Sequence, residues 1–220
     1  MGLLDKFRQF AEGLSAVARA GTSGDARAER DVFPGSDQPS NRQMNTTLIR
    51  NLADNAETLS PAEWSTIVEE HARFLESGGT GGRWELLSVS GLPLCIYQGA
   101  QGRRGEQAVL RLKGIAGLDA SGAWLSWADL SGCYGQGVDL SGADLTGSVM
   151  IDSWFEQANF EASRMTDVDL SGARLTGANF RDADLSGADF EATDCTGADF
   201  RGANLEGARF PGAVLEDVVV

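Results

Sequence analysis

The sequence predicts a solenoid, a fold in which short repeats stack on one another, preceded by a smaller region of helices and strands. From residue 125 to residue 220, every fifth position carries Leu, Phe, Met, Cys or Val, with Gly135 as the exception. A small residue stands two positions before each of these sites and is Ala at 12 of the 20. Self-similarity at a fixed period is the signature of a repeat architecture, and a period of five fits neither an α-helix nor a simple strand.

The five positions of each repeat divide into an inward pair and an outward trio. The large residue and the small residue are expected to face a core, whereas the other three positions carry Asp, Asn, Ser, Thr, Gly, Arg and Glu. The segments ADLSG, ADLTG, ANFRD, ADFEA, ADFRG and ANLEG follow this pattern in one unbroken register. They resemble the motif A(D/N)LXX of the pentapeptide-repeat family.

This resemblance covers roughly the last hundred residues. It implies a mainly β fold, a right-handed quadrilateral β-helix with four pentapeptides, and so about 20 residues, in each coil. Residues 20 apart in the sequence should then stack, as Phe160, Phe180 and Phe200 would in one column and Asn159 and Asn179 in another. We assign residues 113–220 to this β-helix.

The chain before the repeats is predicted to form a leading amphipathic helix (1–20), a polar linker (21–43) and a small α/β cap (44–112). Apolar residues of the leading helix share one stripe, formed by Leu3, Leu4, Phe7, Phe10, Leu14 and Val17. Three interpretations of this helix are open: it packs on its own chain, it docks to a partner or a membrane surface, or it is a frayed terminus. The length of the linker favours docking, and membrane contact through residues 3–18 is its less favoured form.

Within the cap, one helix is expected from about residue 44 to residue 57. Another is expected to begin at Ser60 as N-cap, with Pro61 in the first turn and Glu63 completing a capping box. Short strands are predicted in RWELLSVSGLPLCIYQG and QAVLRLKG. We expect this cap to close the N-terminal end of the β-helix.

The negative charge of the chain is concentrated in the repeats. The chain has a formal charge of −14, and residues 119–220 contribute −13 through 18 acidic and 5 basic side chains. This excess argues against direct binding of nucleic acid or an anionic membrane by the repeats. No apolar run approaches the roughly 18 residues of a membrane span, and the first residues lack the apolar core of a signal peptide, so a cytoplasmic location is expected.

Catalytic, cofactor and metal sites are not expected. The sole histidine, His71, lies on the predicted second cap helix and is expected to face solvent or cap an element. The carboxylates of the motif are evenly spaced and are expected to be solvated, and no phosphate-binding loop is present. Cys95, Cys133 and Cys195 have neither disulfide nor metal spacing and are expected to be reduced thiols. The sequence therefore predicts a protein that is not an enzyme.

Two outward surfaces are candidates for binding a partner. On one, the column Tyr134, Trp154 and Arg174 has the order needed for cation–π contact. Further apolar residues lie on the same early coils and are either covered by the cap or leading helix or form a partner hot spot: Trp124, Trp127, Val149 and Ile151. The second surface is acidic and carries Asp129, Asp152, Asp169, Asp189 and Glu191.

These features predict a non-catalytic scaffold that presents an acidic β-helical surface to a protein partner of unknown identity. The resemblance offers an alternative, because quinolone-resistance members of the family act as DNA mimics on type II topoisomerases. On that alternative, this would be a bacterial modulator, an inhibitor, of DNA gyrase. Apolar residues at the end of the chain predict a C-terminal, end-to-end homodimer through Leu215, Val218, Val219 and Val220.

Overall fold

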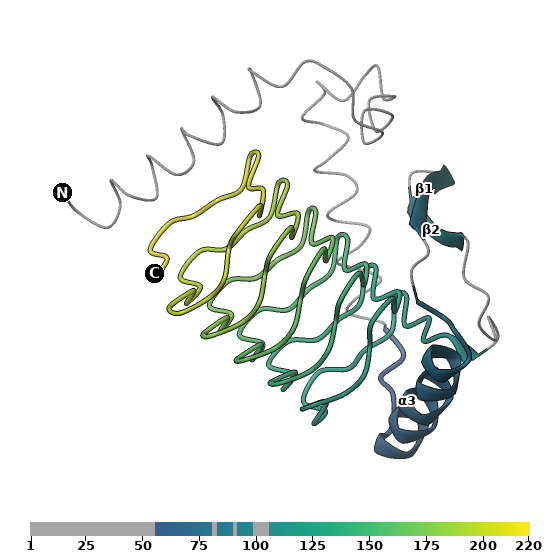
Figure 1. Cartoon of the computed structure of the whole chain (residues 1–220). Helices are drawn as coiled ribbons and strands as arrows, with labels where there is room; N and C mark the ends of the chain where they lie inside the picture. Colours follow the sequence, from purple (N-terminus) through teal and green to yellow (C-terminus); the bar gives the residue numbers. More distant parts are fainter. Residues whose placement is uncertain (1–55, 81–82, 90–91, 99–105) are drawn as a thin grey trace. The chain divides into compact units, whose positions relative to one another are not determined.

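The computed structural model describes residues 56–80, 83–89, 92–98 and 106–220, all within one compact unit, Ile49–Val220 (Figure 1). The predicted leading helix 1–20 and linker 21–43 lie outside the described residues, as does most of the predicted helix 44–57. The division of the chain at residues 20, 43 and 112 therefore stays a prediction. Throughout the described part, no helix combines the length and the apolar composition needed to cross a bilayer.

Residues 109–220 form a stack of coils, in which each coil consists of four pentapeptides. Parallel bridges join the outward residue before each large residue to its equivalent on the next coil, from the pair Val109 and Asp129 at one end to Asp199 and Val219 at the other. A new bridge occurs in every pentapeptide, so each coil has four sides (Figure 1). Each of these bridges is isolated, so the coils are held together by short contacts rather than by long strands. The coil period predicted from the sequence is confirmed.

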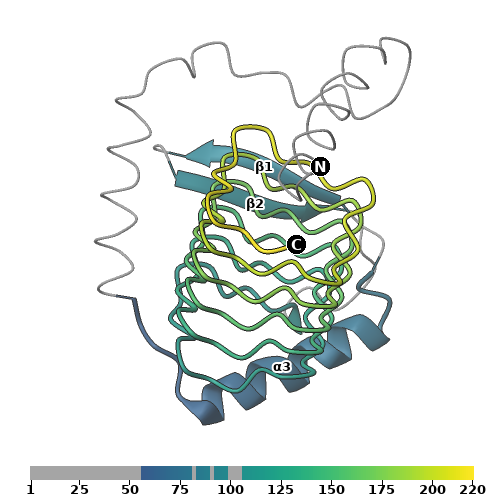
Figure 2. The same ribbon diagram turned by 90° about the vertical axis from the view of Figure 1, so that its left-hand side faces the viewer.

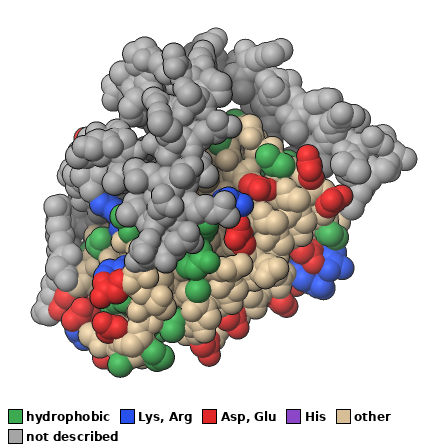
Figure 3. Space-filling view, turned by 180° about the vertical axis from the view of Figure 1, so that it is seen from behind, with side chains coloured by type: hydrophobic (Ala, Val, Ile, Leu, Met, Phe, Trp, Pro, Cys, Tyr) green, Lys and Arg blue, Asp and Glu red, His purple; other side chains and the backbone are tan. Residues whose placement is uncertain are grey.

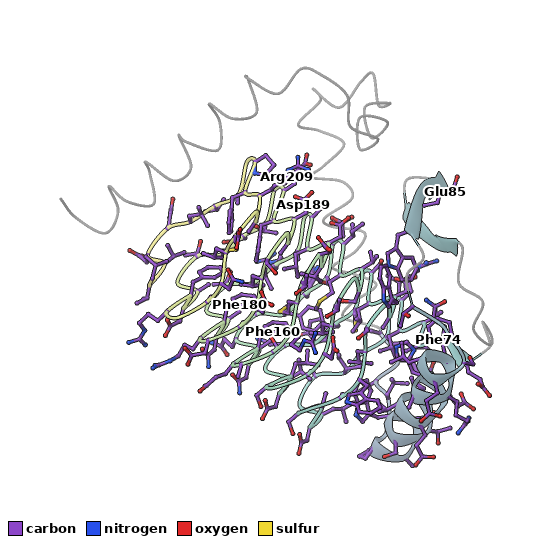
Figure 4. The ribbon with its side chains drawn as sticks, viewed as in Figure 1. Phe74, Glu85, Phe160, Phe180, Asp189 and Arg209 are labelled. Atoms are coloured by element: carbon purple, nitrogen blue, oxygen red, sulfur yellow. The ribbon has the colours of Figure 1, made fainter. Side chains whose placement is uncertain are left out.

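Large inward residues fill the centre of the coils. Phe160 and Phe180 are fully buried, with their rings parallel within 3° and 4.9 Å between centroids. Phe200 continues the column, 5.0 Å beyond Phe180 and parallel within 6°. Figure 4 shows Phe160 and Phe180 on neighbouring coils. The predicted phenylalanine column is therefore confirmed.

A hydrogen-bonded turn forms each corner of a coil. The N–H of the third residue after the large one donates to its carbonyl, as Cys133 does to Leu130 over 3.0 Å. The second residue after the large one has a positive φ, which explains the frequent glycine there, for example Gly132 with φ 62°.

The outward Asp or Asn of the motif adds a second restraint at the corner. Its Oδ1 accepts the backbone N–H two residues later, as Asp139 does from Ser141 over 3.0 Å. Such side-chain turns are the reason Asp and Asn favour these positions. The same bond occurs at Asp119, Asp129, Asp144, Asn159, Asp169, Asn179, Asp184, Asp189, Asp194, Asp199 and Asn204.

Helix α3 (Pro61–Glu76) begins at the residue that the sequence predicts. The Ser60 hydroxyl accepts the Glu63 N–H over 3.3 Å, and the Glu63 carboxylate accepts the Ser60 N–H over 2.8 Å, which completes the capping box. Trp64 is buried in the core of the coils, and Ile67 and Val68 pack against that core. The helix therefore covers the N-terminal end of the core, and Figure 2, seen from the C-terminal end of the coils, shows it running across them.

Strands β1 (Arg83–Val89) and β2 (Leu92–Gln98) form an antiparallel hairpin, with Arg83 opposite Gln98 and Val89 opposite Leu92. Among the described residues, this is the one sheet whose strands are longer than a single bridge. Trp84 fixes the hairpin to the early coils, because its Nε1 donates to the Gly147 carbonyl over 2.8 Å. The side of these coils is thus covered by the hairpin.

Candidate protein-binding surface

The predicted aromatic column is present on one side of the coils. Tyr134 and Trp154 have ring centroids 6.1 Å apart, and Arg174 Cζ lies 5.0 Å from the Trp154 ring centroid, within cation–π range. Glu156 holds the guanidinium, with 3.0 Å between its Oε1 and Arg174 Nε. Trp154 is only 7% exposed, so the accessible members of the column are Tyr134 and Arg174.

Three of the other outward apolar residues are covered by the hairpin and α3. Trp84 packs with Trp127 and Phe74 in one cluster and with Val149 and Ile151 in another. Val149 and Ile151 are 1% and 8% exposed as a result. Because the hairpin and α3 lie over these residues, they do not offer a free hot spot.

Trp124 differs from these residues because it is 58% exposed. It bridges to Asp144 on the next coil, and further outward positions on this side carry Arg164, Asp184 and Asn204. Arg164 Nη1 lies 3.9 Å from Asp144 Oδ2, and its side chain is 70% exposed. This side of the stack, which we call the Trp124 side, combines an accessible indole with alternating charges.

The predicted acidic surface is only partly exposed, and the expectation of a row of solvated carboxylates is wrong at two of its members. Asp129 is 1% exposed and forms an ion pair with Arg111. Asp189 is 9% exposed and lies 3.4 Å from Arg209 Nη1, at the edge of the coils seen in Figure 4. The remaining members are half-buried Asp152 and Asp169 and exposed Glu191. In Figure 3, acidic side chains are spread over the described part of the visible face instead of forming one patch.

The acidic side chains also belong to the turns, a role that the charge count alone did not reveal. The N–H and hydroxyl of Ser141 hold the pKa of Asp139 below its usual range. The pKa of Asp184 is lowered chiefly by the Ser186 hydroxyl, and that of Asp199 chiefly by Arg201. The signal was present in the sequence, because Asp and Asn in turns typically accept the backbone N–H two residues later.

In the described part of the chain, the thiols of Cys133 and Cys195 and the imidazole of His71 are buried. Burial raises the pKa of the Cys195 thiol to about 12, and it raises that of Cys133 as well. The side chain of Cys95 lies outside the described residues. His71 does not face solvent: it is fully buried between α3 and the first coil. Within the described ranges, no cluster of His, Cys, Asp and Glu could hold a metal ion.

The last coil carries the residues predicted to form a dimer contact. Leu215, Val218 and Val220 are partly buried and pack against the core, whereas Val219 is 42% exposed. Val214 is 43% exposed at the equivalent position of the neighbouring side. One coil earlier, these two outward positions carry Asp194 and Asp199.

The repeat register, the four-sided coils and the turn-capping Asp and Asn agree with one family. Its model, described as pentapeptide repeats, matches eight copies in the segments 117–152, 150–182 and 178–217. The coils are pentapeptide repeats. Among curated proteins, none matches the sequence.

Several solved pentapeptide-repeat proteins are similar to this chain. QnrB1, a plasmid-mediated fluoroquinolone resistance protein, is 23% identical over 51% of this chain and 57% of its own, with a TM-score of 0.39. HetL from Nostoc sp. PCC 7120, which is involved in heterocyst differentiation regulation, is 25% identical over 51% of this chain and 62% of its own, with a TM-score of 0.30. The chain therefore spans about three fifths of each. Because both TM-scores are low, the assignment rests on the repeats themselves.

Proposed function

We propose that this protein is a non-catalytic scaffold that binds a protein partner through the Trp124 side of its pentapeptide-repeat coils. The observation that carries this proposal is Trp124 itself. At the same outward position of other coils, Asp144, Asp184 and Asn204 accept a backbone N–H and restrain the turn. An indole cannot accept this bond, because its one polar group is a donor.

Trp124 therefore gives up a turn restraint and leaves more than half of a large apolar side chain in water. Neither property stabilises the coils. Trp is, however, among the residues that dominate the binding energy of protein interfaces. A binding role accounts for both properties at once.

The charge of the coils indicates a partner with a basic surface. Residues 119–220 carry −13, and the carboxylate of Asp144 beside Trp124 is 29% exposed. An excess of one sign steers an oppositely charged partner toward the surface and raises the association rate. We therefore expect binding to weaken as salt is added.

The substitution Trp124→Asn tests this proposal, because Asn is the neutral turn-capping residue of the motif. It removes the indole, restores an acceptor for the turn and leaves the net charge unchanged. Val109→Asn is the matched control, since Val109 is a second exposed apolar residue at an outward position, 56% exposed. Tagged proteins would be used to capture partners from cell extract, with quantification by mass spectrometry.

A partner retained by the wild type and by Val109→Asn, but lost with Trp124→Asn, is the expected result. The thermal stability of Trp124→Asn should equal or exceed that of the wild type. Equal capture by all three proteins would contradict the proposal.

A second candidate function is the modulation of DNA gyrase by DNA mimicry, favoured by the acidic excess along the coils. Supercoiling by purified gyrase should then be inhibited, and less so as salt rises. Asp169→Asn combined with Glu191→Gln removes two accessible charges and keeps the turn acceptor at residue 169, so inhibition should weaken in a folded protein. No inhibition at micromolar protein would exclude this function while leaving the scaffold proposal standing.

We also propose a homodimer through the last coil, supported by the exposed Val214 and Val219. Light scattering should give twice the monomer mass for the wild type at tens of micromolar. Val219→Asp, which places a charge at this contact, should give a monomer. A wild type that stays monomeric at this concentration would contradict the dimer.

A further inference from the structure

His71 joins α3 to the first coil through both nitrogens of its ring. Nδ1 accepts the backbone N–H of Ala108 over 2.9 Å, and Nε2 lies 2.9 Å from the carbonyl oxygen of Ser126. A carbonyl oxygen can only accept, so Nε2 carries the proton and the ring is the neutral tautomer. The side chain is fully buried and stacks on Phe74, with 5.3 Å between ring centroids.

The bond to Ser126 replaces one that a preceding coil would supply. One corner further along, the Ser131 carbonyl accepts the N–H of Leu112, which lies on the preceding coil, over 3.1 Å. At Ser126 the equivalent acceptor is bonded by His71 instead. Beside it, Gln107 Nε2 donates to the Trp127 carbonyl over 2.7 Å. The side chains of His71 and Gln107 thus satisfy the backbone at the N-terminal edge of the stack, where unpaired groups would invite association.

We propose that His71 is a pH-sensitive latch, whose protonation releases α3 from the first coil while the later coils stay folded. A protonated imidazole is a donor at both nitrogens, so it cannot accept the N–H of Ala108. The two N–H groups would instead point at one another in a buried position. Protonation therefore breaks one of the two bonds by which the ring holds the coil.

The charged groups near this contact are already paired or committed to other bonds. On α3 and the segment that follows the hairpin, Glu70 Oε1 and Glu106 Oε1 lie 3.8 and 3.5 Å from Arg73. On the first coils, Asp129 pairs with Arg111, and Asp144 accepts the N–H of Thr146. On β1, Glu85 has an exposed side chain. None of these carboxylates offsets the burial of the ring, which lowers the pKa of His71 from 6.5 to about 4.

The direction of the pH effect follows from this lowered pKa. In the released helix, His71 regains its ordinary pKa of 6.5, so the released state binds more protons than the docked state. Docking is therefore strongest above pH 6.5 and weakens as the pH falls toward 4. The docking equilibrium should fall about 30-fold by about pH 5 and about 300-fold once both states are protonated.

The coils are expected to lose stability at a lower pH than the docking of α3. Their turn carboxylates at Asp139 and Asp184 have pKa values below the ordinary 3.8, because hydrogen bonds from Ser141 and Ser186 favour the ionised form. Acid should consequently loosen α3 first and the coils only at lower pH.

Hydrogen exchange of the full chain, followed by mass spectrometry, tests the latch. Between pH 7 and about pH 5, protection of peptides from 61–76 should fall about 20-fold more than protection of peptides from 160–200, after correction for intrinsic exchange rates. In His71→Gln, which cannot titrate, the ratio of the two protections should not change with pH. Equal pH dependence in the two proteins, or a constant ratio in the wild type, would overturn the proposal.

If His71→Gln does not fold, a titration of the wild type alone tests the latch. His71 is the sole histidine of the chain, so one imidazole resonance reports its titration by NMR. A midpoint near 4, accompanied by the loss of α3 protection, supports the latch. A midpoint near 6.5 in the folded protein would overturn it.

Discussion

Phe180 is the residue at which the stacking of the core can be tested most directly. The substitution Phe180→Ala removes a ring that is fully buried and parallel to a ring on each side, at 4.9 Å from Phe160 and 5.0 Å from Phe200. Phe190 makes an additional edge contact at 6.1 Å and 81°. Replacing a buried Phe by Ala costs about 3–5 kcal/mol, and each lost aromatic pair adds to the cost of area alone. We expect about 4–5 kcal/mol.

Phe210→Ala is the matched control from the last coil. Phe210 is only partly buried and has one parallel neighbour, Phe190 at 4.6 Å, so its truncation should cost roughly half as much. Urea unfolding followed by circular dichroism measures both, with the slope m expected to stay near the wild-type value. With m of about 2 kcal/mol per molar, Phe180→Ala should lower the midpoint by about 2 M. Equal costs at the two positions, or less than about 2 kcal/mol at Phe180, would refute the reasoning.

Acid should destabilise the coils through their turn carboxylates: the pKa of Asp184 is lowered by folding, so its contribution is present above pH 3.8 and lost as the pH falls below it. Asp184→Asn should make the loss of Tm between about pH 5 and pH 3 shallower, and an unchanged slope would argue against this role. Cys195 should resist a thiol reagent in the native protein and react after unfolding in urea, because burial raises its pKa to about 12; rapid native labelling mapped to Cys195 would be inconsistent with its inward position. Gly202→Ala should cost more than Gly197→Ala in free energy of unfolding, since a Cβ at 202 would lie 2.1 Å from Asp182 Oδ1 whereas nothing lies within 4 Å at 197. Adding Asp182→Gly should recover the difference, and additive costs would exclude this contact.

The coils could be predicted well from the sequence because every repeat has the same pattern of inward and outward residue types. The Phe column and the start of α3 at Ser60 depend on spacing and local capping, which are visible in one stretch of chain. The burial of His71 was not visible, because its bonding partners, Ala108 and Ser126, are 37 and 55 residues away and lie on a different element.

The acidic surface was misjudged for a related reason. The exposure of Asp129 depends on Arg111, which reaches it from 18 residues earlier in the chain. The pair Asp189 and Arg209 is separated by one full coil of 20 residues, so it could have been predicted once the coil length was assumed. A count of charges considers each carboxylate alone. In the stack, each carboxylate lies beside side chains of the adjacent coils, which can pair with it.

Each coil consists of four repeats of equal length. The number of repeats before a residue therefore decides which side of the stack its side chain lies on. Deleting one full coil of four pentapeptides within 140–200 would shorten the stack and leave every later side chain on its original side. Deleting a single pentapeptide would also preserve the alternation of inward and outward positions, so the core would still be filled. Every later side chain would nevertheless turn to the adjacent side, and Asp184 would no longer lie on the side of Trp124. A family built this way can therefore redirect its surfaces around the axis by inserting or losing single repeats, with no change to the residues that recognise a partner.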